Sequence, residues 1–372
     1  MRNNKITPEI RLTPDGNGET ECIVFAKNYE LARRALGKYR AKVIKSYPFI
    51  NAFGVQIHVF SIEDIKKLPC INSVCRAERV STCAADVRAP QRRQAFSLRR
   101  FARDGRIGAG APERAKIAFI DTGFCPPLDF YLPRKRTAAF VDFVSGETDP
   151  YDDNGHGTAV GCLLACDGRF SPWVKTGSAA GADVVALKAI ESNGSGSVLN
   201  ILEAMQWLYD NYRRYNVTTL CMSLGGRAEE GKDPLCEAVN ALWNEGITVV
   251  ASAGNSGENG VTSPGRCGRI ITVGSVEKNE NRIVRAKYSS FDKNGSKPEV
   301  CAFGSDVDCV SPDNERVVLS GTSIAAPVVA GLCYRIRLEN PSLSADEVKE
   351  TIISRARFLG SVGTGYGYID AF

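Results

Sequence analysis

The sequence predicts an α/β protein with a mostly parallel central sheet, preceded by a small ferredoxin-like α+β domain. From residue 116 onward, short apolar runs of strand length alternate with longer helical patterns. This alternation is typical of buried parallel strands whose two faces are covered by helices, a three-layer arrangement. Residues 21–80 instead follow the order β-α-β-β-α-β. With 372 residues, of which 43% are hydrophobic, the chain is long enough to bury the cores of two domains.

Composition divides the chain into four segments. The first is polar and contains prolines and glycines, which predicts a flexible tail. The third is rich in arginine, but no aromatic stacking platform accompanies the arginines, so a solvated arm is favoured and no nucleic-acid partner is expected. The predicted segments are a tail (1–20), a small domain (21–84), an arginine-rich linker or arm (85–112) and a larger domain (113–372).

In the small domain, a serine followed three residues later by an aspartate, Ser61 and Asp64, resembles a capping box and predicts the start of a helix. His58, one of only two histidines in the chain, lies in a predicted strand and is expected to be a partly exposed strand residue. The predicted strands are 21–27, 41–48, 52–60 and 71–80, and the predicted helices are 30–39 and 61–68.

In the larger domain, apolar strands and amphipathic helices alternate, so catalytic groups are expected at the carboxyl ends of the strands. The predicted strands are 116–120, 184–189, 219–223, 248–253 and 270–273, and the predicted helices are 157–166, 197–215, 235–245, 323–338 and 344–356.

The cysteines and the N-terminal residues bear on the compartment. Residues 1–21 have no apolar core typical of a secretory signal, and no run of about 18 apolar residues predicts a membrane span. The thirteen cysteines are odd in number and several lie in apolar stretches, which favours free thiols in a reduced, cytoplasmic protein, with export by another route left open. Two close cysteine pairs lack the second pair and the histidines that a zinc site needs, so no metal ligands are predicted.

A candidate nucleophile is Ser323, in the sequence Gly-Thr-Ser-Ile-Ala-Ala-Pro at 321–327. It follows a turn, is surrounded by small residues and stands at the start of an apolar helix, so a substrate carbonyl could approach its hydroxyl. A serine at such a position is more often a helix cap, and a catalytic role therefore requires a base, an orienting acid and an oxyanion donor elsewhere.

Candidates for all three partners exist. His156 lies between glycines before a predicted helix, which suits a general base. Asp121 ends the strand 116–120, where its carboxylate could hold the imidazole. Asn255 follows the strand 248–253 in a Gly-Asn-Ser-Gly turn, so its amide is free to donate to a developing negative charge.

These motifs resemble the signatures of the subtilisin-like serine proteases, the subtilases. Ile-Asp-Thr-Gly at 120–123, Asn-Gly-His-Gly-Thr at 154–158, Ala-Gly-Asn at 253–255 and Gly-Thr-Ser at 321–323 occur in that family's order, which differs from the order in α/β-hydrolases. The resemblance covers about residues 88–372 and implies a subtilisin-like fold. It also implies that Ser323 is the nucleophile, His156 the general base and Asp121 its orienting acid, with Asn255 and the Ser323 amide forming the oxyanion hole.

The resemblance also implies a cleft that binds an extended peptide as an added strand. The pocket for the scissile residue would depend on residues 253–255 and 261–264. The substrate-binding residues that it implies are Ser223, Leu224 and Gly225 on one edge, Gly194, Ser195 and Gly196 on the other, and Ala253 and Gly254 beside the pocket.

The small domain resembles the inhibitory propeptide of the family, which the enzyme removes itself. Its last strand would run into the active site, and the expected cut lies between Thr82 and Arg88. The partners implied are thus a peptide or protein substrate and the chain's own propeptide, with no membrane partner.

Two departures from the family pattern stand out. Ala159 replaces a histidine that often follows the catalytic one, away from the catalytic roles. The family's calcium loop is not recognisable in residues 167–173, so no cofactor is expected for the chemistry and structural calcium has no identifiable loop.

The predicted function is therefore a subtilisin-type serine endopeptidase, made as a self-processing zymogen and acting through an acyl-enzyme. Two alternatives remain open at this point. One is a dedicated maturation protease for a particular precursor or leader peptide, and the other is a pseudoprotease that only binds peptides.

Overall fold

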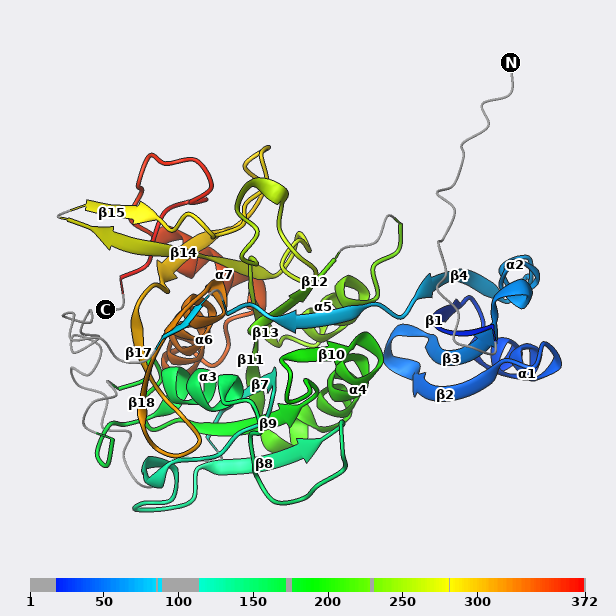
Figure 1. Ribbon diagram of the computed structural model, residues 1–372, viewed down its shortest axis with the longest axis horizontal. Coiled ribbons are helices and arrows are strands. Elements are labelled where there is room, and N and C mark those ends of the chain that lie inside the picture. Colours follow the sequence, from blue (N-terminus) through cyan, green and yellow to red (C-terminus); the bar gives the residue numbers. More distant parts are fainter. Residues whose placement is uncertain are drawn as a thin grey trace. The chain divides into compact units, whose positions relative to one another are not determined.

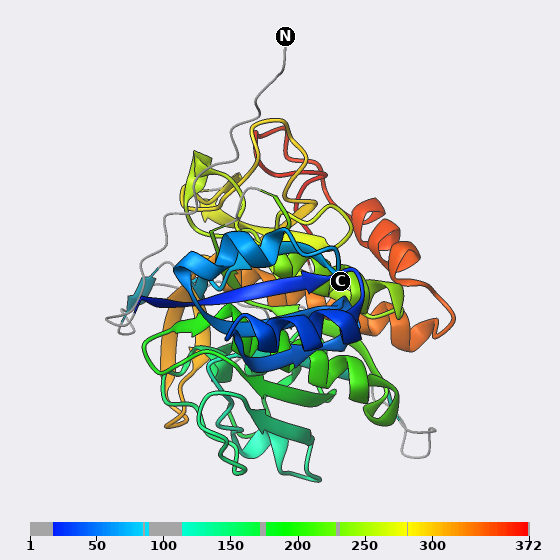
Figure 2. The ribbon, with the colours of Figure 1, turned by 90° about the vertical axis from the view of Figure 1, so that its right-hand side faces the viewer.

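The computed structural model describes residues 18–84, 86–88, 114–171, 176–227, 231–280 and 282–370. The chain divides into two compact units, Met1–Glu78 and Arg79–Phe372. Figures 1 and 2 show the ribbon in two views. The division falls within the segment predicted as the small domain, because residues 79–82 join the second unit. Most of the predicted tail and arginine-rich linker lies outside the described residues.

The first unit has a four-stranded antiparallel sheet with two helices, in the predicted order of elements. The strand order in the sheet is β2-β3-β1-β4, so β1 is central and pairs with both β3 and β4. The elements are β1 (Glu19–Ala26), α1 (Tyr29–Lys38), β2 (Lys42–Tyr47), β3 (Ala52–His58), α2 (Ile62–Lys66) and β4 (Ile71–Arg76).

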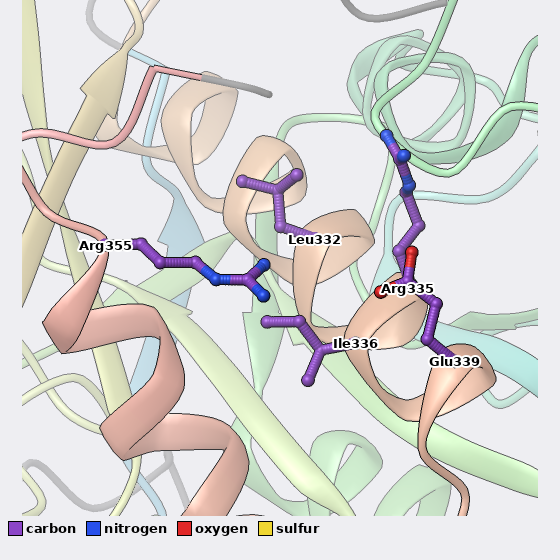
Figure 3. A pocket seen from close by; sticks show the side chains of 5 residues that line it. All are labelled: Leu332, Arg335, Ile336, Glu339 and Arg355. Atoms are coloured by element: carbon purple, nitrogen blue, oxygen red, sulfur yellow. The ribbon is translucent and has the colours of Figure 1, made fainter. Parts of the chain in front are cut away.

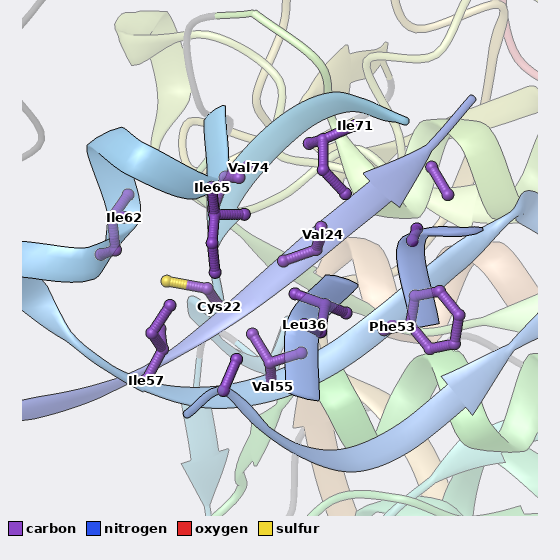
Figure 4. Close-up of a cluster of buried hydrophobic side chains, with 13 residues drawn as sticks. Cys22, Val24, Leu36, Phe53, Val55, Ile57, Ile62, Ile65, Ile71 and Val74 are labelled. Carbon is purple, nitrogen blue, oxygen red and sulfur yellow. The ribbon is translucent and has the colours of Figure 1, made fainter. Parts of the chain in front are cut away.

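The core of this unit lies between one face of the sheet and the helices. Alternate residues of a strand share a face, and this places Cys22 and Val24 of β1 beside Val55 of β3 (Figure 4). Leu36 of α1 and Ile65 of α2 are fully buried against them. The apolar residues of the strands and those of the helices therefore pack together in one cluster.

Two predictions for this unit were wrong. The strand expected at 71–80 ends at Arg76, and residues 79–82 form a separate strand, β5, because they pair on both sides, with β10 (Ser195–Ser197) and with β12 (Leu224–Gly226). Ser61 makes no capping hydrogen bond, since its backbone already lies in a helical turn. His58 caps that turn instead, with its side chain accepting a hydrogen bond from the Phe60 amide.

The second unit is built on a mostly parallel sheet, which confirms the predicted fold class. The order β15-β14-β13-β11-β7-β9-β8 is parallel throughout except at β15, and β16 adds to β14 in parallel. The strands are β7 (Lys116–Asp121), β8 (Thr137–Asp142), β9 (Asp183–Lys188), β11 (Val217–Met222), β13 (Thr248–Ser252), β14 (Ile271–Asn279), β15 (Arg282–Arg285) and β16 (Val300–Phe303).

Helices cover both faces of this sheet (Figure 1). Helix α3 (His156–Ala165) packs with α6 (Thr322–Glu339), and α4 (Val198–Tyr215) packs with α5 (Pro234–Asn244). All ten residues of α3 are buried, which explains why its sequence is apolar all round. Helix α7 (Ala345–Ser354) begins with a capping box between Ser344 and Glu347.

Two small three-stranded sheets flank the central one. The first is β10-β5-β12, from β5 (Arg79–Thr82), β10 (Ser195–Ser197) and β12 (Leu224–Gly226). The second is β17-β18-β6, from β6 (Asp86–Arg88), β17 (Val307–Val310) and β18 (Arg316–Ser320). The apolar patterns of the sequence did not predict these short strands, nor β8, β15 and β16 of the central sheet.

The cysteines differ from the expectation of free thiols at one pair. Cys236 of α5 and Cys267 form a disulfide across a sequence separation of 31 residues. No motif in the sequence predicts a pair this far apart, because the disulfide depends on how α5 packs against the loop that carries Cys267. None of the helices in the described part of the chain has the length and apolar character needed to cross a bilayer.

Candidate active site

The predicted catalytic residues gather at the carboxyl ends of the parallel strands. Strand β7 lies between β9 and β11. The strands that follow it in the chain are added on both sides of it, β8 and β9 on one side and β11 and β13 on the other. Such a switch point opens a crevice at the strand ends. Asp121 is the last residue of β7, and Asn255 follows β13.

The aspartate and the histidine are hydrogen-bonded. Nδ1 of His156 lies 2.7 Å from Oδ1 of Asp121, and both side chains are buried. The same oxygen accepts a hydrogen bond from the Thr122 amide at 2.7 Å. A carboxylate at Nδ1 favours the tautomer that keeps Nε2 free to accept a proton. Nε2 is buried and has no hydrogen-bond partner among the described residues.

The environment raises the pKa of His156. Burial alone would lower it, because a charged imidazolium is poorly solvated there, but the Asp121 carboxylate outweighs burial by its charge and its hydrogen bond, with a smaller contribution from Asp152. The histidine is thus suited to take up a proton during the reaction.

Asp152 organises the loop before the histidine, a role that the sequence did not suggest. Its carboxylate accepts hydrogen bonds from the Gly155 amide at 2.9 Å, the Thr158 amide at 2.8 Å and the Thr122 hydroxyl at 2.8 Å. The Thr122 hydroxyl in turn accepts from the Gly157 amide at 2.9 Å. These bonds join the end of β7 to the start of α3, and so hold the aspartate and the histidine together.

Ser323 lies in the first turn of α6 and faces the chain's own backbone. Its hydroxyl donates a hydrogen bond to the Cys83 carbonyl oxygen at 2.7 Å, and its amide donates to the same oxygen at 3.3 Å. A Cβ at Gly321 would lie 2.3 Å from that oxygen, so the close approach requires glycine there.

The Asn255 side chain completes this arrangement. Its Nδ2 donates to the Cys83 carbonyl oxygen, and its Oδ1 accepts hydrogen bonds of 3.0 Å from both the amide and the hydroxyl of Thr322. Thr322 therefore fixes which end of the amide group points at the carbonyl, a positioning role that no pattern in the sequence indicates. Two of the donors to this carbonyl, Nδ2 of Asn255 and the Ser323 amide, have the geometry needed to stabilise an oxyanion there, whereas the third, the Ser323 hydroxyl, is the predicted nucleophile.

The residues before this carbonyl lie in the cleft as a strand. Gly194 and Ser223 accept hydrogen bonds from the Thr82 amide at 2.9 Å and the Cys83 amide at 3.2 Å. The two ladders pair Ser195 with Ser81 and Gly196 with Val80 on one side, and Leu224 with Thr82 and Gly225 with Ser81 on the other.

The residues after this carbonyl follow a different edge. Strand β6 pairs antiparallel with β18, with Val87 opposite Leu319 and Asp86 opposite Ser320. The sequence did not predict that β18 belongs to the cleft. The last residue of β18, Ser320, immediately precedes Gly321 and lies three residues before Ser323, so the nucleophile and the leaving side of the cleft belong to one continuous segment.

The remaining predicted residues are also placed. Ala253 accepts a hydrogen bond from the Thr262 amide at 3.1 Å, and Gly254, with a φ of +100°, lies against the Thr262 side chain. His58 is in the first unit, where it is exposed at the end of β3, and it makes none of the contacts described for the cleft.

The larger part of the chain matches a known protein family. Residues 113–368 match the model of the subtilase family. The chain belongs to the subtilase family of serine proteases. It is 34% identical over 267 residues to serine protease AprX of Bacillus subtilis, covering 63% of this chain and 60% of AprX. It is 30% identical over 354 residues to a thermostable alkaline protease of Halalkalibacterium halodurans, covering 94% of this chain and 91% of that protease.

A solved structure shares the fold. Fervidolysin from Fervidobacterium pennivorans, described as a keratinolytic enzyme related to subtilisin, superposes with a TM-score of 0.76 at 18% identity. The match covers 95% of this chain and 60% of fervidolysin. The chain thus spans less than two thirds of both AprX and fervidolysin.

A buried arginine, Arg136, lies just before β8 and contacts the end of α3. The Arg136 guanidinium donates to the carbonyl oxygens of Ala165 and Ala182 at 2.9 Å each and of Asp129 at 2.7 Å, and its side chain is almost fully buried. These three carbonyl oxygens are therefore paired with a fixed cation. Among the described residues, no cluster of three or more His, Cys, Asp or Glu side chains could hold a metal.

A separate pocket lies at the opposite end of α6 from Ser323 (Figure 3). Leu332, Arg335, Ile336 and Glu339 of α6 and Arg355 at the end of α7 line it. It contains none of the predicted catalytic residues.

Proposed function

We propose that the chain is a subtilisin-type serine endopeptidase whose first substrate is its own Cys83–Ala84 bond. The observation that supports this most directly is the Cys83 carbonyl oxygen, which accepts hydrogen bonds from Ser323 and from Asn255. This bond lies in the interval, Thr82 to Arg88, in which the sequence predicts the cut.

The chemistry follows from the atoms at the site. The Ser323 Oγ attacks the Cys83 carbonyl carbon while its proton passes to Nε2 of His156, and Asp121 stabilises the resulting imidazolium. The negative oxygen of the intermediate is held by Nδ2 of Asn255 and the amide of Ser323. The carbon–nitrogen bond then breaks, and His156 returns the proton to the Ala84 amine.

The second half releases the acyl-enzyme. A water molecule replaces the departed amine and gives a proton to His156 as it attacks the ester on Ser323. The ester bond breaks, the proton returns to Ser323, and the chain that ends at Cys83 is released with a free carboxylate. Its residues 79–83 are then a product that can remain in the cleft as an inhibitor, which is the zymogen behaviour that we propose.

Other substrates would bind as β5 does. The ladder hydrogen bonds of β10 and β12 recognise backbone, so any extended peptide with acceptable side chains can take this place. The alternative of a dedicated maturation protease uses the same geometry and differs only in how many sequences are accepted. A pseudoprotease would bind the strand without cutting it.

The test is intact mass spectrometry of the purified full chain at neutral pH beside the Ser323→Ala variant. We expect the parent to separate into residues 1–83 and 84–372 and the variant to stay whole. Cleavage of both proteins at the same bond would point to a contaminating protease. Failure of the parent to cut itself or to react with a fluorophosphonate at Ser323, even after limited proteolysis empties the cleft, would favour the pseudoprotease.

A further inference from the structure

The side chain of Cys83 occupies a closed pocket beside the scissile carbonyl. Cys83 is 7% exposed. A Cβ placed on Gly225 would lie 3.2 Å from its Sγ and 2.2 Å from the Thr262 Oγ1. Gly225 therefore forms one wall of the pocket, and both the thiol and the threonine lie against that wall.

Thr262 also reaches the opposite wall. A Cβ on Gly254 would lie 2.9 Å from both Cγ2 and Oγ1 of Thr262. The threonine side chain thus bridges the space between the two glycines, the space into which a longer side chain at position 83 would have to extend. Although Gly225 and Gly254 have no side chains, the cleft gains no depth between them, because the Thr262 side chain fills that space.

The position of Thr262 is held from several sides. Its amide donates to the Ala253 carbonyl, and the next residue, Ser263, exchanges two backbone hydrogen bonds with Gly226 at 2.9 and 3.0 Å. The Ser263 hydroxyl donates to the Asp233 carboxylate at 2.9 Å. A β-branched side chain on such a backbone has few rotamers by which it could move aside.

The pocket is also polar at its base. The hydroxyls of Ser252 and Thr262 favour the charged form of the Cys83 thiol, but burial outweighs their effect. Burial raises the pKa of this thiol to about 11, so it is neutral in the pocket at physiological pH. A small side chain with a weak hydrogen-bonding group is therefore well accommodated.

We propose that Thr262 determines the specificity of this protease by restricting its scissile-residue pocket to small, uncharged side chains such as Cys, Ala and Ser. This inference rests on the proposed function and adds the class of substrate. Leu, Phe and Tyr are excluded because their side chains would overlap with Thr262, and overpacking of a site that cannot relax is costly.

The test uses self-cleavage of the full chain, followed as a first-order rate by intact mass spectrometry. Cys83→Ala and Cys83→Ser should cut within about tenfold of the parent, whereas Cys83→Phe should cut at least about 100-fold more slowly. In the double variant Cys83→Phe with Thr262→Gly, the rate should recover by at least about tenfold. The Thr262→Gly change alone should not accelerate the parent, since Cys83 already fits.

A second measurement guards against variants that fold poorly. Processed parent enzyme, freed of residues 1–83, is given quenched peptides Arg-Val-Ser-Thr-X-Ala-Ala-Asp-Val-Arg with X as Cys, Ala, Leu or Phe. The kcat/KM should fall at least about 100-fold from Ala to Phe for the parent and much less for Thr262→Gly. Thr262→Ser is the matched control, because it keeps the hydroxyl and loses only the methyl group.

The outcomes separate this inference from the proposed function. Equal cleavage after Ala and Phe, or a parent that cuts itself at a bond other than Cys83–Ala84, would overturn the role of Thr262 and leave a serine protease in place. A Phe penalty that Thr262→Gly does not relieve would also overturn it. Absence of any Ser323-dependent cleavage would remove both proposals.

Discussion

The two arms that flank the scissile bond are held very differently. Strand β5, before the bond, lies between β10 and β12 and is the central strand of its sheet. Among the residues that the structure describes, strand β6, after the bond, pairs only with β18 and lies at the edge of its sheet. The carbonyl carbon belongs to the arm with two ladders, and the leaving nitrogen belongs to the arm with one.

This asymmetry matches what the reaction requires of each product. The amine product must depart before water can reach the acyl-enzyme, and one ladder holds it less firmly than two. The arm that ends at Cys83 keeps two ladders, the oxyanion donors and a filled pocket. We therefore expect the first arm to remain as an inhibitor and the second to leave.

A large effect should come from the oxyanion donor that lies between the two arms. Asn255→Ala removes a donor to the Cys83 carbonyl without touching either ladder, and it should slow self-cleavage by about 10² to 10³-fold. Intact mass spectrometry over time measures this, with Asn279→Ala, an exposed strand residue, as the control. A loss below about fivefold would mean that strand binding, and not charge stabilisation, limits the reaction.

The pH dependence of the self-cleavage rate reports on the catalytic base and not on how the two arms are bound. The neutral form of His156 is the base, and because its pKa is raised, the self-cleavage rate should begin to fall at a higher pH than for an ordinary imidazole. Below that pKa the rate should drop about tenfold per pH unit. In Asp121→Asn the inflection should move to lower pH and the rate should fall by about 10⁴-fold. A rate independent of pH from 8 down to 5 would contradict the assignment of the base.

Product peptides test the arms directly. Arg-Val-Ser-Thr-Cys, residues 79–83, should inhibit the processed enzyme with a Ki at least about tenfold lower than Ala-Ala-Asp-Val-Arg, residues 84–88. The reason is the second ladder, since each additional hydrogen bond contributes about 1 kcal/mol. Inhibition assays with a quenched peptide give both constants, and a peptide with the order of residues 79–83 scrambled is the control. Equal constants would refute the comparison.

The smallest effect concerns the outer end of β5. Arg79 forms a 2.7 Å ion pair with Glu191, and the two side chains are 54% and 35% exposed. Glu191→Gln should slow self-cleavage by only about two- to fivefold, and the difference should vanish in about 1 M salt, where surface charges are screened. Glu350→Gln on the surface of α7 is the control. A loss that persists at high salt would indicate a structural role for Glu191.

The sequence predicted the parts of the site that depend on local pattern. Asp121, His156 and Asn255 each lie where a strand ends or a helix begins, and small neighbours mark each position. The parallel sheet could be predicted for the same reason, because its strands are continuous apolar runs.

The parts that the sequence did not predict depend on contacts between distant segments. The family resemblance places Thr262 in the segment 261–264 beside the pocket, but only the fold shows that its side chain lies between Gly225 and Gly254. The sequence predicts a single strand over 71–80, because β4 and β5 are both extended. In the structure β5 is a separate strand because it pairs with β10 and β12 in the cleft. Strand β18 likewise pairs with β6, which is distant in the chain, and Asp152 accepts a hydrogen bond from Thr122, 30 residues away.

The Arg136 guanidinium has a consequence for how this protein responds to its surroundings. A bound ion stabilises a folded protein through mass action, so its contribution grows with the logarithm of the ion concentration. Arg136 supplies positive charge to three carbonyl oxygens as part of the covalent chain. The stabilisation that Arg136 gives to this joint, between the end of α3 and the start of β8, therefore carries no concentration term.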